Sequence, residues 1–131
     1  MTTTATETAL QATVMPSITV NDLQQSIRFF EALGFAIEQR WEHEGTLRGV
    51  SLKAGAAQIA LGQDDWKKGR DREKGAGVRL YINTPKVDEV AARAKAAGIT
   101  LDSEPTDTPW GGRAFEVTEP SGFKLTFMTN A

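Results

Sequence analysis

The side chains of this chain that could do chemistry form a short set. None of the 131 residues is cysteine, which excludes disulfides, thiolate nucleophiles and cysteine-bound zinc. The single histidine, His43, lies in the segment Glu42-His43-Glu44 beside a predicted hairpin, where a solvated turn is favoured over a metal or catalytic role. No serine has a nucleophile-elbow context, and no glycine-rich phosphate-binding loop is present. The sequence therefore does not support nucleophilic or histidine-based catalysis.

Glu116 and Arg79 remain as a candidate acid–base pair. If Phe115 and Val117 face the helices, Glu116 points the opposite way, to the side predicted below for Arg79. A carboxylate beside a guanidinium could polarise or deprotonate a bound substrate. Arg79 could also pair with a carboxylate or phosphate of a ligand. A surface or ion-paired glutamate is the competing interpretation of Glu116.

The elements that position these residues follow from hydrophobic periodicity. Each half of the chain predicts one strand, one helix and three further strands. In the first half the helix follows an N-cap at Asn21-Asp22 and ends at Gly34. The strands are expected at 14–20, from Phe35 to about Trp41, at 47–53 and at 58–62. In the second half the helix opens at Thr84 or Pro85 and ends at Gly98, with strands at 78–82, from Ile99 and Leu101, at 113–118 and at 123–128.

The two halves are copies of one pattern. Gly34-Phe35 corresponds to Gly98-Ile99, an offset of 64 residues (98 minus 34). The sequence thus predicts an α+β fold with two β-α-β-β-β modules. We expect a disordered lead-in at 1–12 and one domain at 13–131. Its first module covers about 13–63 and its second about 77–131. The highly charged linker between them, about 64–76, contains Trp66.

Strand alternation divides each strand between two faces. The apolar positions, such as Val14, Pro16, Ile18 and Val20, are expected to cover the helices. The second face is mixed, which fits either a solvated sheet face or the wall of a concave pocket. Its predicted members are Met15, Ser17, Thr19, Gln58, Ala60, Gly62, Arg79, Tyr81, Asn83, Lys124, Thr126 and Met128.

Three segments together resemble the vicinal oxygen chelate superfamily, which includes glyoxalase I, extradiol dioxygenases and bleomycin-resistance proteins. The first runs from Ile18 to Phe30 and is closed by Leu33-Gly34-Phe35. The second is Val87-Asp88-Glu89-Val90 leading to Lys95-Ala96-Ala97-Gly98. The third is Pro109-Trp110-Gly111-Gly112-Arg113 followed by Glu119-Pro120-Ser121-Gly122. The resemblance implies paired βαβββ modules that form a curved mixed sheet around a cavity, usually in a homodimer. Domain-swapped and intrachain pairing of the modules both remain open.

The resemblance also places four metal-ligand positions in this chain. Metal enzymes of that family carry histidine, glutamate or glutamine there. The corresponding residues here are Met15, Ala60 (or Gln58), Arg79 and Thr126. Divalent metals in such sites need imidazole or carboxylate donors, and the permanent charge of arginine repels a cation. We therefore expect no metal and no cofactor, and the replaced ligands leave enzymatic activity uncertain.

The favoured function is metal-independent binding of a small aromatic or anionic metabolite or drug. Aromatic walls and a few polar anchors suit such a pocket. The candidate ligand-binding residues are Met15, Ser17, Trp41, Gln58, Ala60, Arg79, Tyr81, Trp110, Thr126 and Met128. Trp66 and Phe115 are further candidate walls. For Trp110 loop packing is an equal alternative, and for Trp66 an interface role. The second hypothesis is a metal-independent lyase or isomerase that uses Glu116 and Arg79. A third is a partner protein that binds through segment 63–76.

Composition limits the remaining classes. The formal net charge is −2, which does not suggest nucleic-acid binding. No apolar run reaches the length of about 18 residues that a membrane span needs. We therefore expect a cytoplasmic protein with no nucleic acid and no membrane among its partners. The resemblance implies that its partners are a small molecule and a second copy of the chain.

Overall fold

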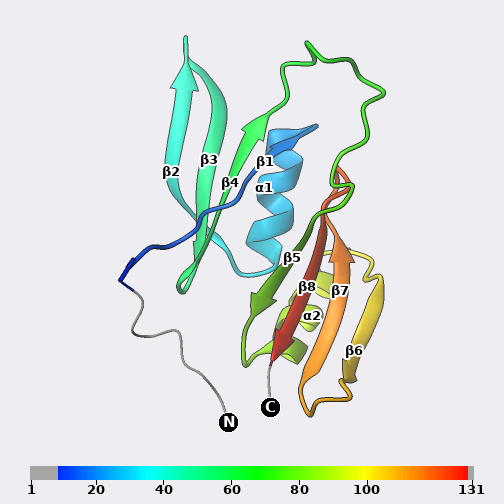
Figure 1. The fold of residues 1–131 in the computed structure, drawn as a ribbon. Coiled ribbons are helices and arrows are strands. Elements are labelled where there is room, and N and C mark those ends of the chain that lie inside the picture. The colour runs from blue at the N-terminus through cyan, green and yellow to red at the C-terminus, as the bar shows by residue number, and fades with distance from the viewer. Residues whose placement is uncertain (1–8, 130–131) are drawn as a thin grey trace.

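A computed structural model describes residues 9–129 of the chain. The predicted lead-in, 1–12, falls largely outside the described residues. The fold contains two four-stranded mixed sheets and two helices (Figure 1). Module one contains β1 (Ser17–Val20), α1 (Leu23–Ala32), β2 (Ala36–His43), β3 (Thr46–Ala54) and β4 (Ala57–Gln63). Module two contains β5 (Arg79–Asn83), α2 (Val87–Ala96), β6 (Ser103–Asp107), β7 (Arg113–Thr118) and β8 (Lys124–Thr129).

The internal repeat is confirmed by strand order and register. The sheets have the equivalent orders β1-β4-β3-β2 and β5-β8-β7-β6. In each, the first and last strands of the module are parallel neighbours. Ser17 pairs with Ala60 in the first sheet, and Tyr81 pairs with Thr126 in the second. These two pairs are equivalent positions, 64 and 66 residues apart, so the α+β two-module prediction is correct.

The start of α1 and the ends of both helices are as the sequence indicates, whereas α2 begins at Val87 and not at the predicted Thr84 or Pro85. The Asp22 side chain accepts a hydrogen bond from the Gln25 backbone N–H at 3.1 Å, which satisfies one of the free donors at the start of α1. Gly34 follows α1 with φ +107° and Gly98 follows α2 with φ +85°. Glycine reaches this left-handed conformation without steric cost, so the backbone can turn directly into the next segment after each helix.

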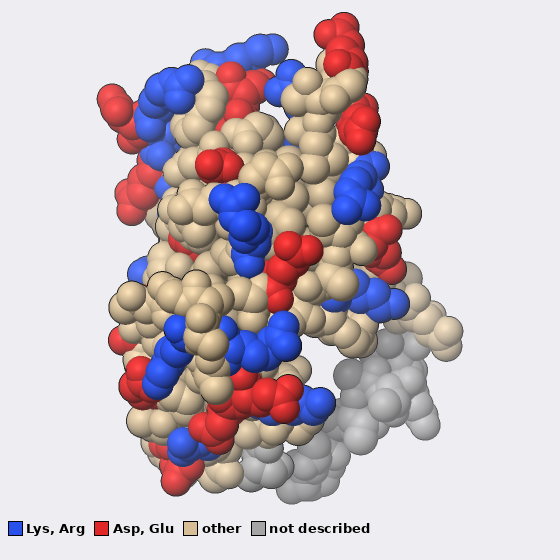
Figure 2. Space-filling view, turned by 180° about the vertical axis from the view of Figure 1, so that it is seen from behind, with Lys and Arg blue, Asp and Glu red and all other residues tan. Residues whose placement is uncertain are grey.

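The core lies between each sheet and its helix. Phe30 and Leu52 in module one and Phe115 and Leu125 in module two are fully buried there. Seen from the side opposite to Figure 1, the surface carries Lys and Arg interspersed with Asp and Glu (Figure 2). None of the described helices is long and apolar enough to cross a membrane.

Two predictions about strand boundaries are also wrong. Val14 was expected to cover a helix, but β1 begins only at Ser17 and Val14 is 82% exposed. Pro16 explains this late start, because proline cannot donate a ladder hydrogen bond. Ile99 and Leu101 pack against the core before β6, which starts at Ser103. Both residues contact the core from the segment between α2 and β6. Their apolar side chains led to the prediction of a strand there.

Candidate functional site

The open face of the module-two sheet, on the side away from α2, gathers most of the predicted site. Register places Tyr81, Thr126, Glu116 and Ser103 in one row across the four strands. Directly paired residues point to the same side of a sheet, so this row presents four side chains together. Met128 pairs with Ala114 in the next row, toward the loop that carries Trp110.

A cavity of about 330 Å³ lies on this face. Five predicted residues line it, which are Tyr81, Trp110, Glu116, Thr126 and Met128. Tyr81 and Trp110 leave 63% and 59% of their surface exposed, so their rings are available to a ligand. Sequence reasoning missed three further lining residues, Ser103, Thr106 and Ala114. Ala114 could have been found from strand alternation, because it lies two residues before Glu116 and points to the same face. Ser103 and Thr106 could not, because Pro105 argues against a strand in the segment that carries them.

Arg79 forms the charged end of the site. Its Nη1 donates to Thr126 Oγ1 at 3.0 Å and lies 3.3 Å from Glu116 Oε2. Glu116 is also fixed through its backbone N–H, which donates to Ser103 Oγ at 3.1 Å. The guanidinium therefore holds Glu116 and Thr126 in place from beside the cavity. A ligand there would meet Tyr81, Thr126 and Glu116 in one row and Met128 in the next, with Arg79 beside the cavity.

The open face of module one carries the other predicted residues but gathers them less tightly. Ser17, Ala60, Ser51 and Gln39 form one row, and Thr19, Gly62, Gly49 and Trp41 form the next. A side chain on Gly49 would meet Trp41 Cε3 at 3.4 Å and the Leu61 carbonyl oxygen at 2.9 Å, so the Trp41 ring lies over a position that must stay glycine. Gln58 and Tyr81 together line a second cavity of about 410 Å³. Met15, Ser17, Trp41 and Ala60 line neither cavity.

Ser51 is a residue of this face that the sequence did not single out. Its hydroxyl is buried and has no hydrogen-bond partner among the described residues. Buried polar groups are nearly always paired. The hydroxyl of Ser51, beside Ala60, is therefore an exception to that rule.

The four positions equivalent to metal ligands do not suit a divalent cation. Met15 is exposed, Ala60 has no donor atom, and Thr126 already accepts a hydrogen bond from Arg79. Arg79 adds a permanent positive charge. No group of three or more His, Asp or Glu side chains in residues 9–129 is arranged to hold a metal ion. The side chains at these four positions therefore do not fit the metal site that the resemblance to metal enzymes implies.

The charged linker is tied to module one. Asp64 is buried and lies 2.8 Å from Lys74 Nζ and 2.7 Å from Arg72 Nη2. Hydrogen bonds from Lys74, then Arg72, then the Trp66 backbone N–H hold the pKa of the Asp64 carboxyl far below its ordinary value. Arg70 and Lys74 lie over the Trp66 ring at 4.6 and 4.7 Å. Trp66 is thus held by cations of its own linker and does not line the cavity on module two.

Phe115 is not a wall of the site, and that prediction is wrong. Its ring is fully buried on the helix side and stacks on Phe127 with centroids 5.2 Å apart. The position of Phe115 agrees with the alternation that places Glu116 on the open face. His43 is exposed in the β2–β3 hairpin, 3.8 Å from the Glu44 carboxylate.

Comparisons with known proteins agree with this architecture. Residues 10–127 match the family model described as the Glyoxalase/Bleomycin resistance protein/Dioxygenase superfamily. A search of curated proteins gives no match. Among solved structures, TioX from Micromonospora sp. ML1 superposes with a TM-score of 0.74 at 21% identity, covering 92% of this chain and 100% of that one.

Two further structures share the fold. A virulence protein from Salmonella typhimurium gives a TM-score of 0.68 at 21% identity and covers 95% of this chain and 100% of its own. A superfamily member from Sphaerobacter thermophilus gives 0.67 at 24% identity and covers 92% and 100%. At these identities the similarity shows a common fold and carries no information about a ligand. The chain belongs to the glyoxalase/bleomycin resistance protein/dioxygenase superfamily.

Proposed function

We propose that this protein is a metal-independent small-molecule-binding protein that sequesters a small aromatic or anionic molecule. The observation that carries the proposal is the cavity on module two, whose lining combines the rings of Tyr81 and Trp110 with the polar groups of Glu116 and Thr126. Its volume of about 330 Å³ is at the lower end of the range for ligand sites. Family membership supports the proposal, since the superfamily's name includes resistance proteins. A cytoplasmic location is part of the proposal.

The chemistry of the lining predicts how a ligand lies. An aromatic body gains most against Tyr81, Trp110 and Met128. A polar group would then reach the Arg79–Glu116 pair. Glu116 already neutralises Arg79 at 3.3 Å, so an anion must compete with that carboxylate for the guanidinium.

This competition gives opposite expectations for the two charges. With 1-naphthoate as the probe, Arg79→Gln is expected to weaken binding by about 1.5 kcal/mol, roughly tenfold, because a charged hydrogen bond is lost. Glu116→Gln is expected to strengthen binding, because it removes the competing carboxylate and leaves a polar group of the same shape. Isothermal titration calorimetry of the three proteins measures both effects.

Neutral 1-naphthamide is the matched control ligand, and its affinity should respond less to either change. If 1-naphthoate binds equally to both variants and the parent, Arg79 and Glu116 are not part of the site. Elemental analysis of the purified protein separately tests metal independence. One divalent metal per chain that survives dialysis would contradict it.

The Arg79–Glu116 geometry also favours a second candidate, a metal-independent lyase or isomerase. The carboxylate lines the cavity and its position is fixed by the guanidinium, which is what a proton-transfer residue requires. Glu116→Gln separates the two functions. A turnover lost in that variant while ligand affinity persists would favour the enzyme, and a turnover that survives would exclude Glu116 as the base.

We further propose that the functional unit is a homodimer whose second copy covers the open faces. Trp41, Tyr81 and Trp110 each leave 45% or more of their surface exposed, and Met15 leaves 43%. Large apolar side chains exposed along two sheet faces are typical of an interaction surface. Closure by a second chain would enclose the module-two cavity and would bring a partner near the unpaired hydroxyl of Ser51.

Light scattering is expected to give twice the chain mass. Trp41→Glu should shift the protein toward monomer, because a charge on a covered apolar surface must be desolvated. His43→Glu, in the exposed hairpin at the end of β2, is the matched control and should leave the mass unchanged. A monomer at all concentrations, or a dimer indifferent to Trp41→Glu, would count against this interface.

A further inference from the structure

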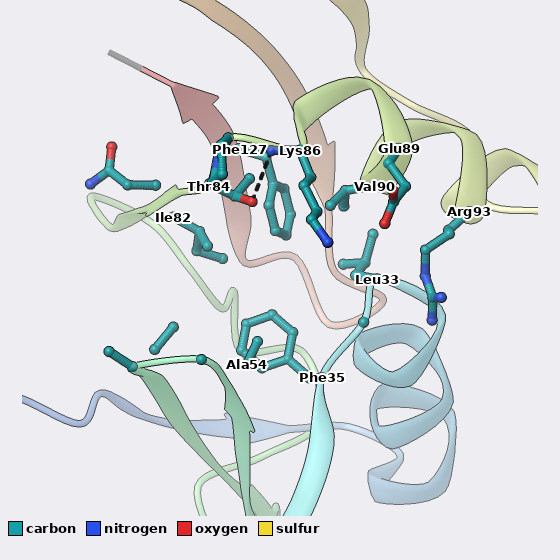
Figure 3. Close-up of a pocket in the computed structure, with 16 residues that line it drawn as sticks. Leu33, Phe35, Ala54, Ile82, Thr84, Lys86, Glu89, Val90, Arg93 and Phe127 are labelled. Atoms are coloured by element: carbon teal, nitrogen blue, oxygen red, sulfur yellow. Dashed lines mark hydrogen bonds between the residues drawn. The ribbon is translucent and has the colours of Figure 1, made fainter.

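A larger cavity lies between the two modules, next to the second cavity, with which it shares the lining residues Phe35, Ala56, Ala57, Ile82 and Asn83. This intermodule cleft has a volume of about 580 Å³, within the range of small-molecule sites. Module one contributes the end of α1, the start of β2 and the β3–β4 hairpin. Module two contributes the β5–α2 connection, α2 and β8 (Figure 3). None of the candidate ligand-binding residues lines this cleft, although Asn83, a predicted member of the second face, does.

The walls of the intermodule cleft are apolar and come from both modules. Leu33 and Phe35 face it from module one, and Ile82, Val90 and Phe127 face it from module two (Figure 3). The hairpin that borders it is Ala54-Gly55-Ala56-Ala57, whose side chains reach no further than Cβ. The hairpin therefore leaves the space open.

The repeat shows that this opening is specific to one copy. The equivalent hairpin of module two, β7–β8, docks on the start of α1. There Ser26 Oγ donates to the buried Glu119 carboxylate at 2.5 Å, and the Asn21 backbone N–H donates to Ser121 Oγ at 2.8 Å.

Counted from the equivalent residues Ala60 and Thr126, Ala57 occupies the position of Phe123. Both residues pack against the core, but the side chain of Ala57 ends at Cβ and fills much less space there than the ring of Phe123. Ser26 likewise corresponds to Val90 at the offset of 64, so the polar contact is also missing. The β7–β8 hairpin thus packs tightly against α1, whereas the β3–β4 hairpin leaves a cleft at the equivalent position beside α2.

One cation, the exposed Lys86, projects into the intermodule cleft, whose lining also includes the carboxylate of Glu89. The Lys86 ammonium points between the apolar walls, and no ion pair joins it to a described residue (Figure 3). Its backbone is fixed, since the Lys86 N–H donates to Thr84 Oγ1 at 3.1 Å. Arg93, also at the cleft, is occupied by the Ala32 and Glu31 carbonyl oxygens at 3.2 and 3.3 Å.

The charges around the cleft favour an anion. Lys86 and Arg93 are positive and Glu89 is the acidic residue of the lining, so the lining carries a net positive charge. The start of α2 lies at Lys86–Val87, where the helix dipole adds to the positive potential. An anionic group would gain most at Lys86, which has no other partner to give up.

We propose that the intermodule cleft binds a small amphipathic monocarboxylate, distinct from the ligand of the open faces. The carboxylate lies at Lys86 Nζ, and the apolar part packs against Phe35, Ile82 and Phe127. Because the walls come from both modules, the bound molecule holds the modules together at the end where the β3–β4 hairpin leaves a gap. This site does not depend on the function proposed above.

Octanoate is the probe, measured by isothermal titration calorimetry on the full chain. We expect saturable binding with one site per chain and a Kd of about 1 mM or tighter. Lys86→Met keeps the apolar stem and removes the charge, and it should weaken octanoate roughly three- to tenfold. Ala57→Phe copies the residue that the other module uses, and it should abolish binding by filling the cleft.

Lys68→Met is the matched control, since Lys68 is exposed in the linker and lies outside the intermodule cleft. Circular dichroism confirms folding of each variant, and Lys86→Met tests the site alone if Ala57→Phe does not fold. The proposal is overturned if octanoate does not bind, if octylammonium binds equally well, or if Lys86→Met binds octanoate like the parent.

Discussion

Replacing Phe115 with alanine is expected to lower the free energy of unfolding by about 3–5 kcal/mol, the usual cost of emptying an aromatic core position. The ring is fully buried and lies nearly parallel to Phe127, with an interplanar angle of 8°. Both the transfer of the ring from water and the stacked contact are lost. Urea denaturation followed by circular dichroism measures the change.

Phe115→Leu is the control, because it keeps most of the buried volume and should cost less than half as much. A loss below about 1 kcal/mol for Phe115→Ala would mean that the ring is not a core residue. The neighbouring Glu116→Gln should alter ligand affinity and leave stability nearly unchanged. The two adjacent residues thus separate the stability of β7 from the chemistry of its open face.

Acidification is expected to destabilise the protein, with Asp64 as a main cause. Its folded pKa is held well below the value of about 3.9 for an unfolded aspartate. The stabilisation is therefore fully present above about pH 4–5 and is lost as pH falls through the unfolded value toward the folded one. Protonated Asp64 would leave Lys74 without its anion, and the Lys74 side chain is only 5% exposed.

Asp64→Asn should lower the melting temperature at pH 7 and flatten its pH dependence between about pH 5 and 2. Melting curves across that range compare the variant with the parent. Asp65→Asn is the control, since Asp65 is an exposed neighbour that accepts a hydrogen bond from the Lys67 backbone N–H. An Asp64→Asn protein with the parent's acid profile would show that the linker contributes no pH-dependent stability.

Much of the fold was predictable because local rules and the repeat agree. The Asp22 cap, Gly34 and Gly98 set the helix ends, and strand alternation put Arg79, Tyr81, Thr126 and Met128 on one face. Where the prediction failed, a tertiary contact outweighed the local pattern. Ile99 and Leu101 read as strand residues because they are apolar, but they pack on the core from a connection.

The sequence predicted several residues of the candidate site, but it did not predict which of them lie together around one cavity. Alternation identifies which side chains share a sheet face, so Tyr81, Glu116 and Thr126 were found together. Alternation does not predict which of the two sheets forms a cavity. Trp41 and Ser17 lie on the predicted face but line neither of the two cavities described for the site. The intermodule cleft had no sequence signal, because it arises from the absence of side chains in the β3–β4 hairpin where that hairpin meets another module.

The asymmetry of the two hairpins has a mechanical consequence. At one end the modules are joined by the buried hydrogen bond from Ser26 to Glu119 and by the exposed one from Asn21 to Ser121. The opposite end is bridged by the exposed Arg93 guanidinium. A rotation of one module relative to the other would keep the buried contact as its axis if the exposed bonds yield first. Such a rotation changes the angle between the two open faces while every strand pairing stays intact.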